Sequence, residues 1–224
     1  MLSKIVPTFD ENTILNDLKK PALKVGTYLF QVTAVAQKIN EKGNMILGLK
    51  LAPLDAQGNA QKPGANLSLV GPFQTPPEAL AEAGVARQEK VPNTLFIIED
   101  YARVRFNEKT PVAMPDVQRV EKINGSYVEV DWNSGAPTGA TAKSKAEHTT
   151  DLGVLHKAAR EFYITAWQNP AMLIGDRFYG RVDYSNEPGG FDGPQVSVDR
   201  KKVPQDPKFI DDLVDMTQEF TELR

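Results

Sequence analysis

A short charged turn between two apolar runs constrains the fold of this chain more than any other feature of its sequence. Residues 26–38 read GTYLFQVTAVAQK, residues 45–55 read MILGLKLAPLD, and residues 40–44 between them read NEKGN. Both runs show the alternation of side-chain types that is typical of β-strands. Gly43 and Asn44 tolerate the positive φ angle of a tight turn. The sequence therefore predicts a β-hairpin.

The alternation gives each predicted strand one apolar face. This face carries Tyr28, Phe30, Val32, Ala34 and Ala36 in the first run and Met45, Leu47, Leu49 and Leu51 in the second. Lys50 lies on the opposite, outward face, whereas Lys38 and Lys42 belong to the region of the turn. These three lysines are the first candidates for a binding role.

Three further strands and a helix are predicted downstream. Residues 66–73, NLSLVGPF, form a strand that Pro72 ends, and an amphipathic helix begins at Thr150 or Asp151 and ends before Pro170. A closing hairpin follows, with strands in MLIGDRFYGRVDYS and QVSVDRKKV around the loop NEPGGFDGP. In its first strand the outward side chains are Arg177, Tyr179 and Arg181, which alternate with Phe178, Gly180 and Val182.

An insertion of about 75 residues separates the third strand from this helix. Residues 75–90 predict a helix with Pro77 in its first turn. Residues 94–106 and 118–132 predict strands of a subsidiary sheet, and residues 133–150, rich in Gly, Ser, Thr and Ala, predict a mobile loop.

Three meandering strands, a helix and a closing hairpin follow the order of the OB-fold, a small five-stranded barrel. We therefore predict a mainly β (α+β) protein with an OB-fold-like domain over residues 26–205, interrupted by the insertion at about 75–150. Residues 1–25 form an N-terminal arm, and residues 206–224 form an acidic amphipathic C-terminal helix or tail.

Composition limits the classes of function. The chain has 224 residues, of which 41% are hydrophobic and 25% charged, and it contains no cysteine. Disulfides, zinc–thiolate sites and cysteine nucleophiles are thereby excluded. The two histidines, His148 and His156, lack a metal-ligand or triad pattern, and no phosphate-binding glycine loop is present. We expect a protein without catalytic residues, metal or cofactor.

The sequence also bears on location and charge. No apolar run reaches the ~20 residues of a membrane span, and the first residues lack a signal-peptide pattern. We therefore expect a cytoplasmic protein with no membrane partner, in the bacterial host cytoplasm if it is viral. The net charge is −3, but residues 206–224 carry six acids and two bases, which leaves +1 on the rest of the chain. The acidic tail either docks on the barrel or a second subunit, or meets a basic groove or partner.

A groove for single-stranded nucleic acid needs spaced cations for phosphates and aromatic faces for bases. The predicted barrel provides such residues on its outward face and loops. The candidates are Lys38, Lys42, Lys50, Arg177, Tyr179, Arg181, Tyr184, Phe191, Arg200, Lys201 and Lys202. The alternative is that lysines at a hairpin keep a sheet edge soluble and that the aromatic rings belong to the core.

The stretch GTYLFQVTAVAQKINEKGNMILGLKLAPLDAQG resembles the opening of small bacteriophage single-stranded DNA-binding proteins. HKAAREFYITAWQNPAMLIGDRFYGRVDY is similar to the helix and fourth strand of that family, and the match covers roughly residues 24–74 and 151–204. The resemblance implies coating of single-stranded DNA during replication or recombination. It also implies that the acidic C-terminus contacts replication or recombination proteins, while a homo-oligomer stays open.

Two other functions compete with this hypothesis. One is a structural or assembly protein that uses its barrel-like domain for interaction, whose contacts would respond little to salt. The other is a nucleic-acid enzyme with a site in the insertion, around Glu99, Asp100 and Asp116, whose nuclease activity would depend on divalent cations.

Overall fold

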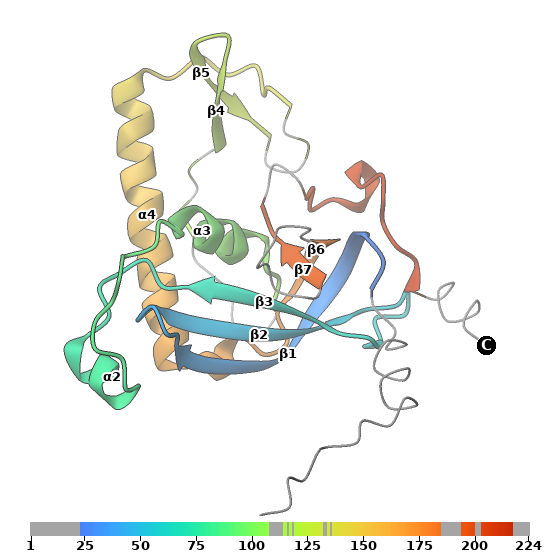
Figure 1. Ribbon diagram of the computed structural model, residues 1–224. Coiled ribbons are helices and arrows are strands. Elements are labelled where there is room, and N and C mark those ends of the chain that lie inside the picture. The colour runs from blue at the N-terminus through green and yellow to red at the C-terminus, as the bar shows by residue number, and fades with distance from the viewer. Residues whose placement is uncertain are drawn as a thin grey trace, which may run out of the picture.

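Five β-strands close into a barrel in the order β1-β2-β3-β7-β6 (Figure 1). The strands are β1 (Gly26–Ile39), β2 (Met45–Pro53), β3 (Ala65–Val70), β6 (Arg177–Tyr184) and β7 (Pro194–Ser197). Neighbouring strands are antiparallel except β3 and β7, which pair in parallel. The predicted mixed α+β chain with a five-stranded barrel is confirmed.

The structure is a computed structural model, and it describes residues 23–107, 114–115, 117, 119–131, 134, 136–184, 194–199 and 203–216. Residues 1–22, which make up most of the predicted N-terminal arm, lie outside this range. Among the described helices, none has both the length and the apolar character that a membrane crossing requires.

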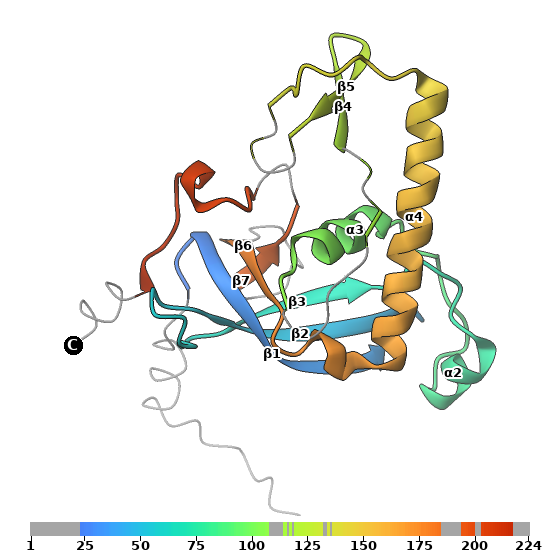
Figure 2. The ribbon, with the colours of Figure 1, turned by 180° about the vertical axis from the view of Figure 1, so that it is seen from behind.

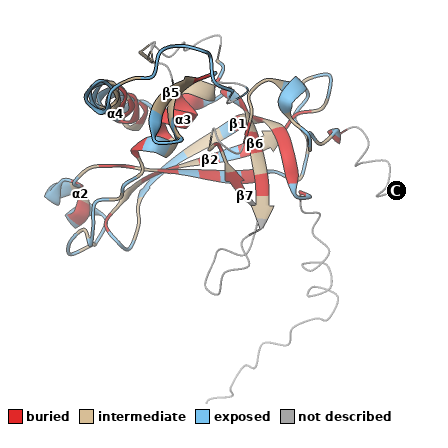
Figure 3. Cartoon of the chain, turned by 90° about the horizontal axis from the view of Figure 1, so that it is seen from above, coloured by how far each residue is buried: buried red, intermediate tan, exposed pale blue. Residues whose placement is uncertain are grey.

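Alternation along the strands fills the barrel with large apolar side chains. The residues that point inward and are buried include Tyr28, Phe30, Val32, Leu47, Leu49, Leu51, Leu67, Leu69, Phe178, Val182 and Val196. Figure 3 shows that buried residues gather on the barrel strands and on the neighbouring helix α3 (Leu95–Val104). Because each strand alternates, the polar residues between these core positions are left on the outer surface.

The alternation in β1 reverses half-way along the strand. The register of β1 against β2 shifts between Val32 and Ala34, so Thr33 is the extra residue of a β-bulge. After the bulge Val35 packs against the core, and Ala36 is exposed. The prediction that Ala34 and Ala36 share the face of Tyr28 was therefore wrong.

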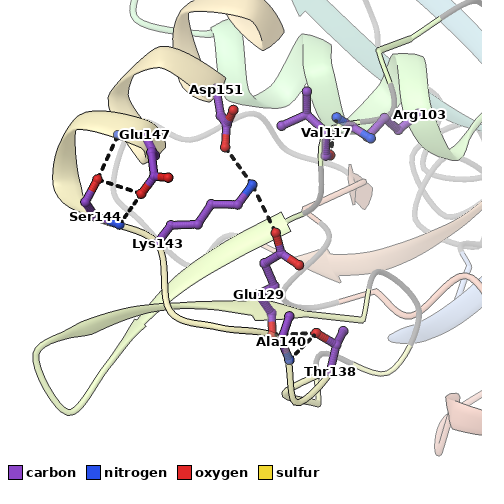
Figure 4. A network of polar contacts seen from close by, with 9 residues as sticks. All are labelled: Arg103, Val117, Glu129, Thr138, Ala140, Lys143, Ser144, Glu147 and Asp151. Atoms are coloured by element: carbon purple, nitrogen blue, oxygen red, sulfur yellow. Dashed lines mark hydrogen bonds and ion pairs between the residues drawn. The ribbon is translucent and has the colours of Figure 1, made fainter.

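Helix α4 (Lys145–Gln168) stands beside the barrel and extends past it (Figures 1 and 2). It begins earlier than predicted, because Ser144 accepts a hydrogen bond from the backbone N–H of Glu147, whose side chain in turn accepts from Ser144 (Figure 4). This capping box satisfies free N–H groups of the first turn. The last residues of the predicted mobile loop are thus helical. The other end of α4 is followed by the 3₁₀-helix η1 (Pro170–Leu173).

The predicted strand over residues 94–106 is instead helix α3, which packs against α4. Its buried apolar residues Leu95, Ile98 and Tyr101 recur every three residues, which suits a helical face better than a strand. The Ile and Phe residues at its start favoured the strand prediction, but burial against α4 overrides that propensity.

Two smaller elements complete the insertion. Helix α2 (Pro77–Glu82) starts with Pro77 in its first turn, as predicted, but ends early, before Gly84 with its φ of 69°. Strands β4 (Arg119–Ile123) and β5 (Ser126–Val130) pair as a hairpin, so residues 118–132 contribute both strands of a small sheet. Lys143 ties this hairpin to α4 through Glu129 at 3.0 Å and Asp151 at 2.8 Å (Figure 4).

The C-terminal segment differs from the predicted helix in its described part. Residues 207–209 form the short 3₁₀-helix η2 (Pro207–Phe209), and residues 210–215 are not helical. Met216 is buried in the barrel core, and Leu213 forms an isolated parallel bridge with Thr27 of β1. The segment therefore docks on the barrel.

Candidate nucleic-acid interface

The outer face of β1, β2 and β3 carries a ladder of cross-strand neighbours. Ala34 pairs with Lys50, which in turn pairs with Asn66, and the next row along joins Ala36, Gly48 and Ser68. Residues that lie directly opposite one another in antiparallel strands point to the same side of the sheet. Lys50 and Asn66 are exposed, so this side faces the solvent.

Lys38 lies on the same outer face as Lys50. It pairs with Ile46, and it sits two positions beyond Ala36, which keeps it on the same side of β1. Lys38 is exposed but belongs to the strand, not to the turn as we expected. The residues between Lys38 and Lys50 on this face, Ala34, Ala36 and Gly48, are small and uncharged, so no side-chain charge separates the two cations.

Lys42 projects from a turn that is held in place. The side chain of Asn40 accepts hydrogen bonds from the backbone N–H groups of Lys42 at 3.1 Å and Asn44 at 2.8 Å. Gly43 supplies the positive φ of 76° that the sequence predicted for this turn. The carbonyl of Lys42 accepts from the backbone of Glu89 at 3.0 Å, and the Lys42 residue remains exposed.

Arg177 extends this face onto β6. It pairs with Gln31 of β1, and its Nε donates to the Gln31 side chain at 3.1 Å. Its neighbour Phe178 points into the core and is buried, so exposed Arg177 points outward as the alternation predicted. Lys38, Lys50 and Arg177 thus share one continuous outer face.

Phe106 flanks Arg177 on the side away from β1, and our sequence interpretation missed it. The two residues exchange backbone hydrogen bonds of 2.7 and 2.8 Å, and Phe106 is 60% exposed. The one sequence feature that could have pointed to Phe106 is its position at the end of residues 94–106, directly before polar Asn107. Because that run predicted a strand of the insertion, nothing connected Phe106 with the barrel.

Tyr179 and Arg181 also point outward, but the C-terminal segment covers them in part. The side-chain amide of Gln205 bonds both backbone groups of Tyr179, at 3.1 and 3.0 Å. Arg181 contacts the carboxylates of Asp212 and Asp183. The chain therefore places acidic groups of its own on this end of the face.

A second anchor holds the same segment on β1. Thr27 donates its backbone N–H to the Asp212 carbonyl at 3.0 Å and accepts from Val214 at 2.9 Å, while its hydroxyl bonds the Asp212 carboxylate at 2.7 Å. Thr27 pairs with Arg181 across β1 and β6. The segment between Gln205 and Val214 therefore contacts both Tyr179 and Arg181 of β6 as well as Thr27 of β1.

The segment changes the electrostatics of Tyr179. Burial of the phenol raises the pKa of Tyr179, and the negative charge of Asp206 raises it further. Hydrogen bonds from Lys208 in turn lower the pKa of the Asp206 carboxyl. Tyr179 thus stays a neutral hydrogen-bond donor, and its ring is less open than that of Phe106.

The remaining predicted binding residues cannot be placed on this face. Phe191, Arg200, Lys201 and Lys202 lie outside the described residues, as does the loop that holds Phe191. Tyr184 is described at the end of β6 by its backbone only.

Of the three acidic residues proposed for a competing nuclease site, the structure describes Glu99 and Asp100, both on α3. Glu99 and Asp100 of α3 are 2% and 3% exposed, and Glu99 lies 3.5 Å from Arg103. Asp116 lies outside the described residues, and among those described no group of three or more His, Cys, Asp or Glu side chains could hold a metal ion.

Comparisons with known proteins add no identification. The chain matches no protein-family model and no curated protein sequence. The face formed by β1, β2 and β6 therefore has to be interpreted from its own geometry.

Proposed function

We propose that this protein binds and coats single-stranded DNA, without catalysis and with little sequence preference, on the outer face of β1, β2 and β6. One observation carries the proposal: exposed Lys38, Lys50 and Arg177 share this face and are separated by small or uncharged side chains. Spaced cations of this kind suit the phosphates of an extended strand.

The barrel supports the same proposal. We assign it to the OB-fold, a five-stranded barrel that binds oligonucleotides near strands 2 and 3 and the loops that flank them. In this chain the first of these loops is the ordered turn that carries exposed Lys42. The proposed role is protection of single strands during phage DNA replication or recombination, with the acidic C-terminal region available to partner proteins.

Fluorescence anisotropy titrations at two salt concentrations test the proposal. One titration uses a labelled single-stranded oligonucleotide, and the other uses a labelled duplex of the same sequence. We expect tighter binding of the single strand. The logarithm of its binding constant should fall with the logarithm of salt concentration, with a slope of about 0.7 per phosphate contact.

Equal affinity for the duplex would contradict the proposal. Self-association that is insensitive to salt, with no binding of either DNA, would favour an assembly protein instead.

A further inference from the structure

Phe106 is a large apolar side chain that the fold holds rigidly and yet exposes. It follows α3 directly and is 60% exposed, whereas its neighbour Arg105 is buried. Both flanking side chains, Arg105 and Asn107, are fixed to one buried carboxylate. The ring therefore stands on a short, anchored piece of backbone.

The carboxylate that fixes these side chains is that of Asp176, which is fully buried and directly precedes β6. It accepts hydrogen bonds from Arg105 Nη1 at 2.6 Å, from Asn107 Nδ2 at 2.7 Å and from the Tyr101 hydroxyl at 2.8 Å. Charge-assisted hydrogen bonds in a buried site are strong and hold their partners in one geometry.

The backbone of Phe106 also fixes the direction of its ring. Phe106 and Arg177 form an antiparallel bridge in which each N–H donates to the other carbonyl, at 2.7 and 2.8 Å. Such directly opposite residues project to the same side, with Cβ atoms about 5 Å apart. Since Arg177 faces outward, the ring projects to the same outer face as the Arg177 side chain.

We propose that Phe106 is a platform on which an unpaired nucleobase stacks, while Arg177 binds the adjoining phosphate. This inference rests on the proposed function, because it names the part of the strand that each residue contacts. A flat ring next to a cation fits one nucleotide, which has a π face and a negative charge. Because the backbone that carries the ring is already held by its bridge to Arg177, little backbone freedom is lost when a base stacks on the ring.

The test compares two strands of equal length, oligo-dT and an abasic oligonucleotide that has the same phosphates but no bases. Phe106→Ala should weaken binding of oligo-dT by about 5- to 150-fold, the loss expected for one stacked base. Its affinity for the abasic strand should equal that of the wild type, because the phosphate contacts remain.

Two substitutions separate stacking from a general apolar contact. Phe106→Trp keeps a flat aromatic face and should retain affinity for oligo-dT, whereas Phe106→Leu should behave like Phe106→Ala. Phe96→Ala removes another exposed ring, 52% exposed on α3 and outside the row of Arg177, and should leave both affinities unchanged. All variants should unfold at the wild-type temperature, since these rings are exposed.

The outcomes distinguish the two proposals. If wild-type protein binds oligo-dT and Phe106→Ala binds it equally well, the platform is refuted while the proposed function stands. Equal losses on oligo-dT and on the abasic strand would also refute stacking. If the wild type binds neither strand, both proposals fail.

Discussion

Gly180 of β6 leaves room for the side chains that fill the barrel. A Cβ atom at this position would lie 2.7 Å from Val196 Cγ1 and 3.1 Å from Phe30 Cδ2. Val196 is a core residue of the neighbouring strand β7, and Phe30 is a core residue of β1 that lies opposite Phe178, two positions from Gly180. Since Arg177 and Tyr179 depend on the packing of β6 for their outward direction, Gly180 supports the proposed face indirectly.

We predict that Gly180→Ala lowers the free energy of unfolding by about 1–3 kcal/mol, because overpacking forces core side chains to move. Urea denaturation measures this change. Gly153→Ala is the matched control: a Cβ there meets nothing within 4 Å, so the substitution in α4 should raise stability by roughly 0.5–1 kcal/mol. Wild-type stability in Gly180→Ala would contradict the packing described for β6.

Single residues of the candidate face could be predicted where a buried neighbour fixes the alternation. Lys50 lies between buried Leu49 and Leu51, and Arg177 precedes buried Phe178, so their outward direction follows from strand periodicity. Phe106 could not be found in this way. Its exposure depends on a bridge to a residue 71 positions away, which no local pattern contains.

Among the elements, the barrel strands were predictable and the helix boundaries were not. Strands β1 and β2 are long, alternating and joined by a turn with Gly43 and Asn44, so local signals agree with the fold. Helix α3 was mistaken for a strand because its apolar face is buried only by tertiary contacts, against α4 and, through Tyr101, against Phe178 of β6. The bulge at Thr33 was missed, since an extra residue in one strand leaves no compositional signal.

The C-terminal segment is the element that most changes the expected interface. Its apolar side chain Met216 enters the core, while Asp206 and Asp212 lie near Tyr179 and Arg181. The sequence left docking and competition as alternatives, and the docked position puts acidic groups beside Tyr179 and Arg181, at one end of the face that we propose binds DNA. If the protein binds DNA as proposed, the docked C-terminal segment therefore also competes with DNA for this face.

Removal of these two charges should therefore strengthen DNA binding. We predict that the double substitution Asp206→Asn and Asp212→Asn raises affinity for single-stranded DNA severalfold, mostly at low salt, where charges are least screened. Anisotropy titrations at two salt concentrations measure the effect.

Met216→Ala tests the docking of the segment on the barrel, because Met216 is buried in the core. It should lower the free energy of unfolding by about 2–5 kcal/mol in urea denaturation. Unchanged low-salt affinity in the double variant would show that the segment is a docking element only.

For the whole molecule, the distribution of charge matters more than its sum. The chain carries a net charge of −3, yet Lys38, Lys42, Lys50 and Arg177 are all exposed around one side of the barrel. Residues 206–224 carry a net charge of −4, which leaves +1 on the rest of the chain. A negative protein can therefore present a locally positive path to a polyanion.

The most direct test of the central claim measures how DNA binding by one combined variant depends on salt. The variant carries Lys38→Ala, Lys42→Ala and Lys50→Ala. Because this variant lacks three cations that we propose bind phosphates, the slope of log affinity against log salt should become shallower by about two, and affinity at low salt should fall. The matched control replaces exposed Lys122, Lys145 and Lys157, on β4 and α4, and should keep the wild-type slope. A wild-type slope in the folded Lys38, Lys42 and Lys50 variant would contradict the claim that DNA binds on this face.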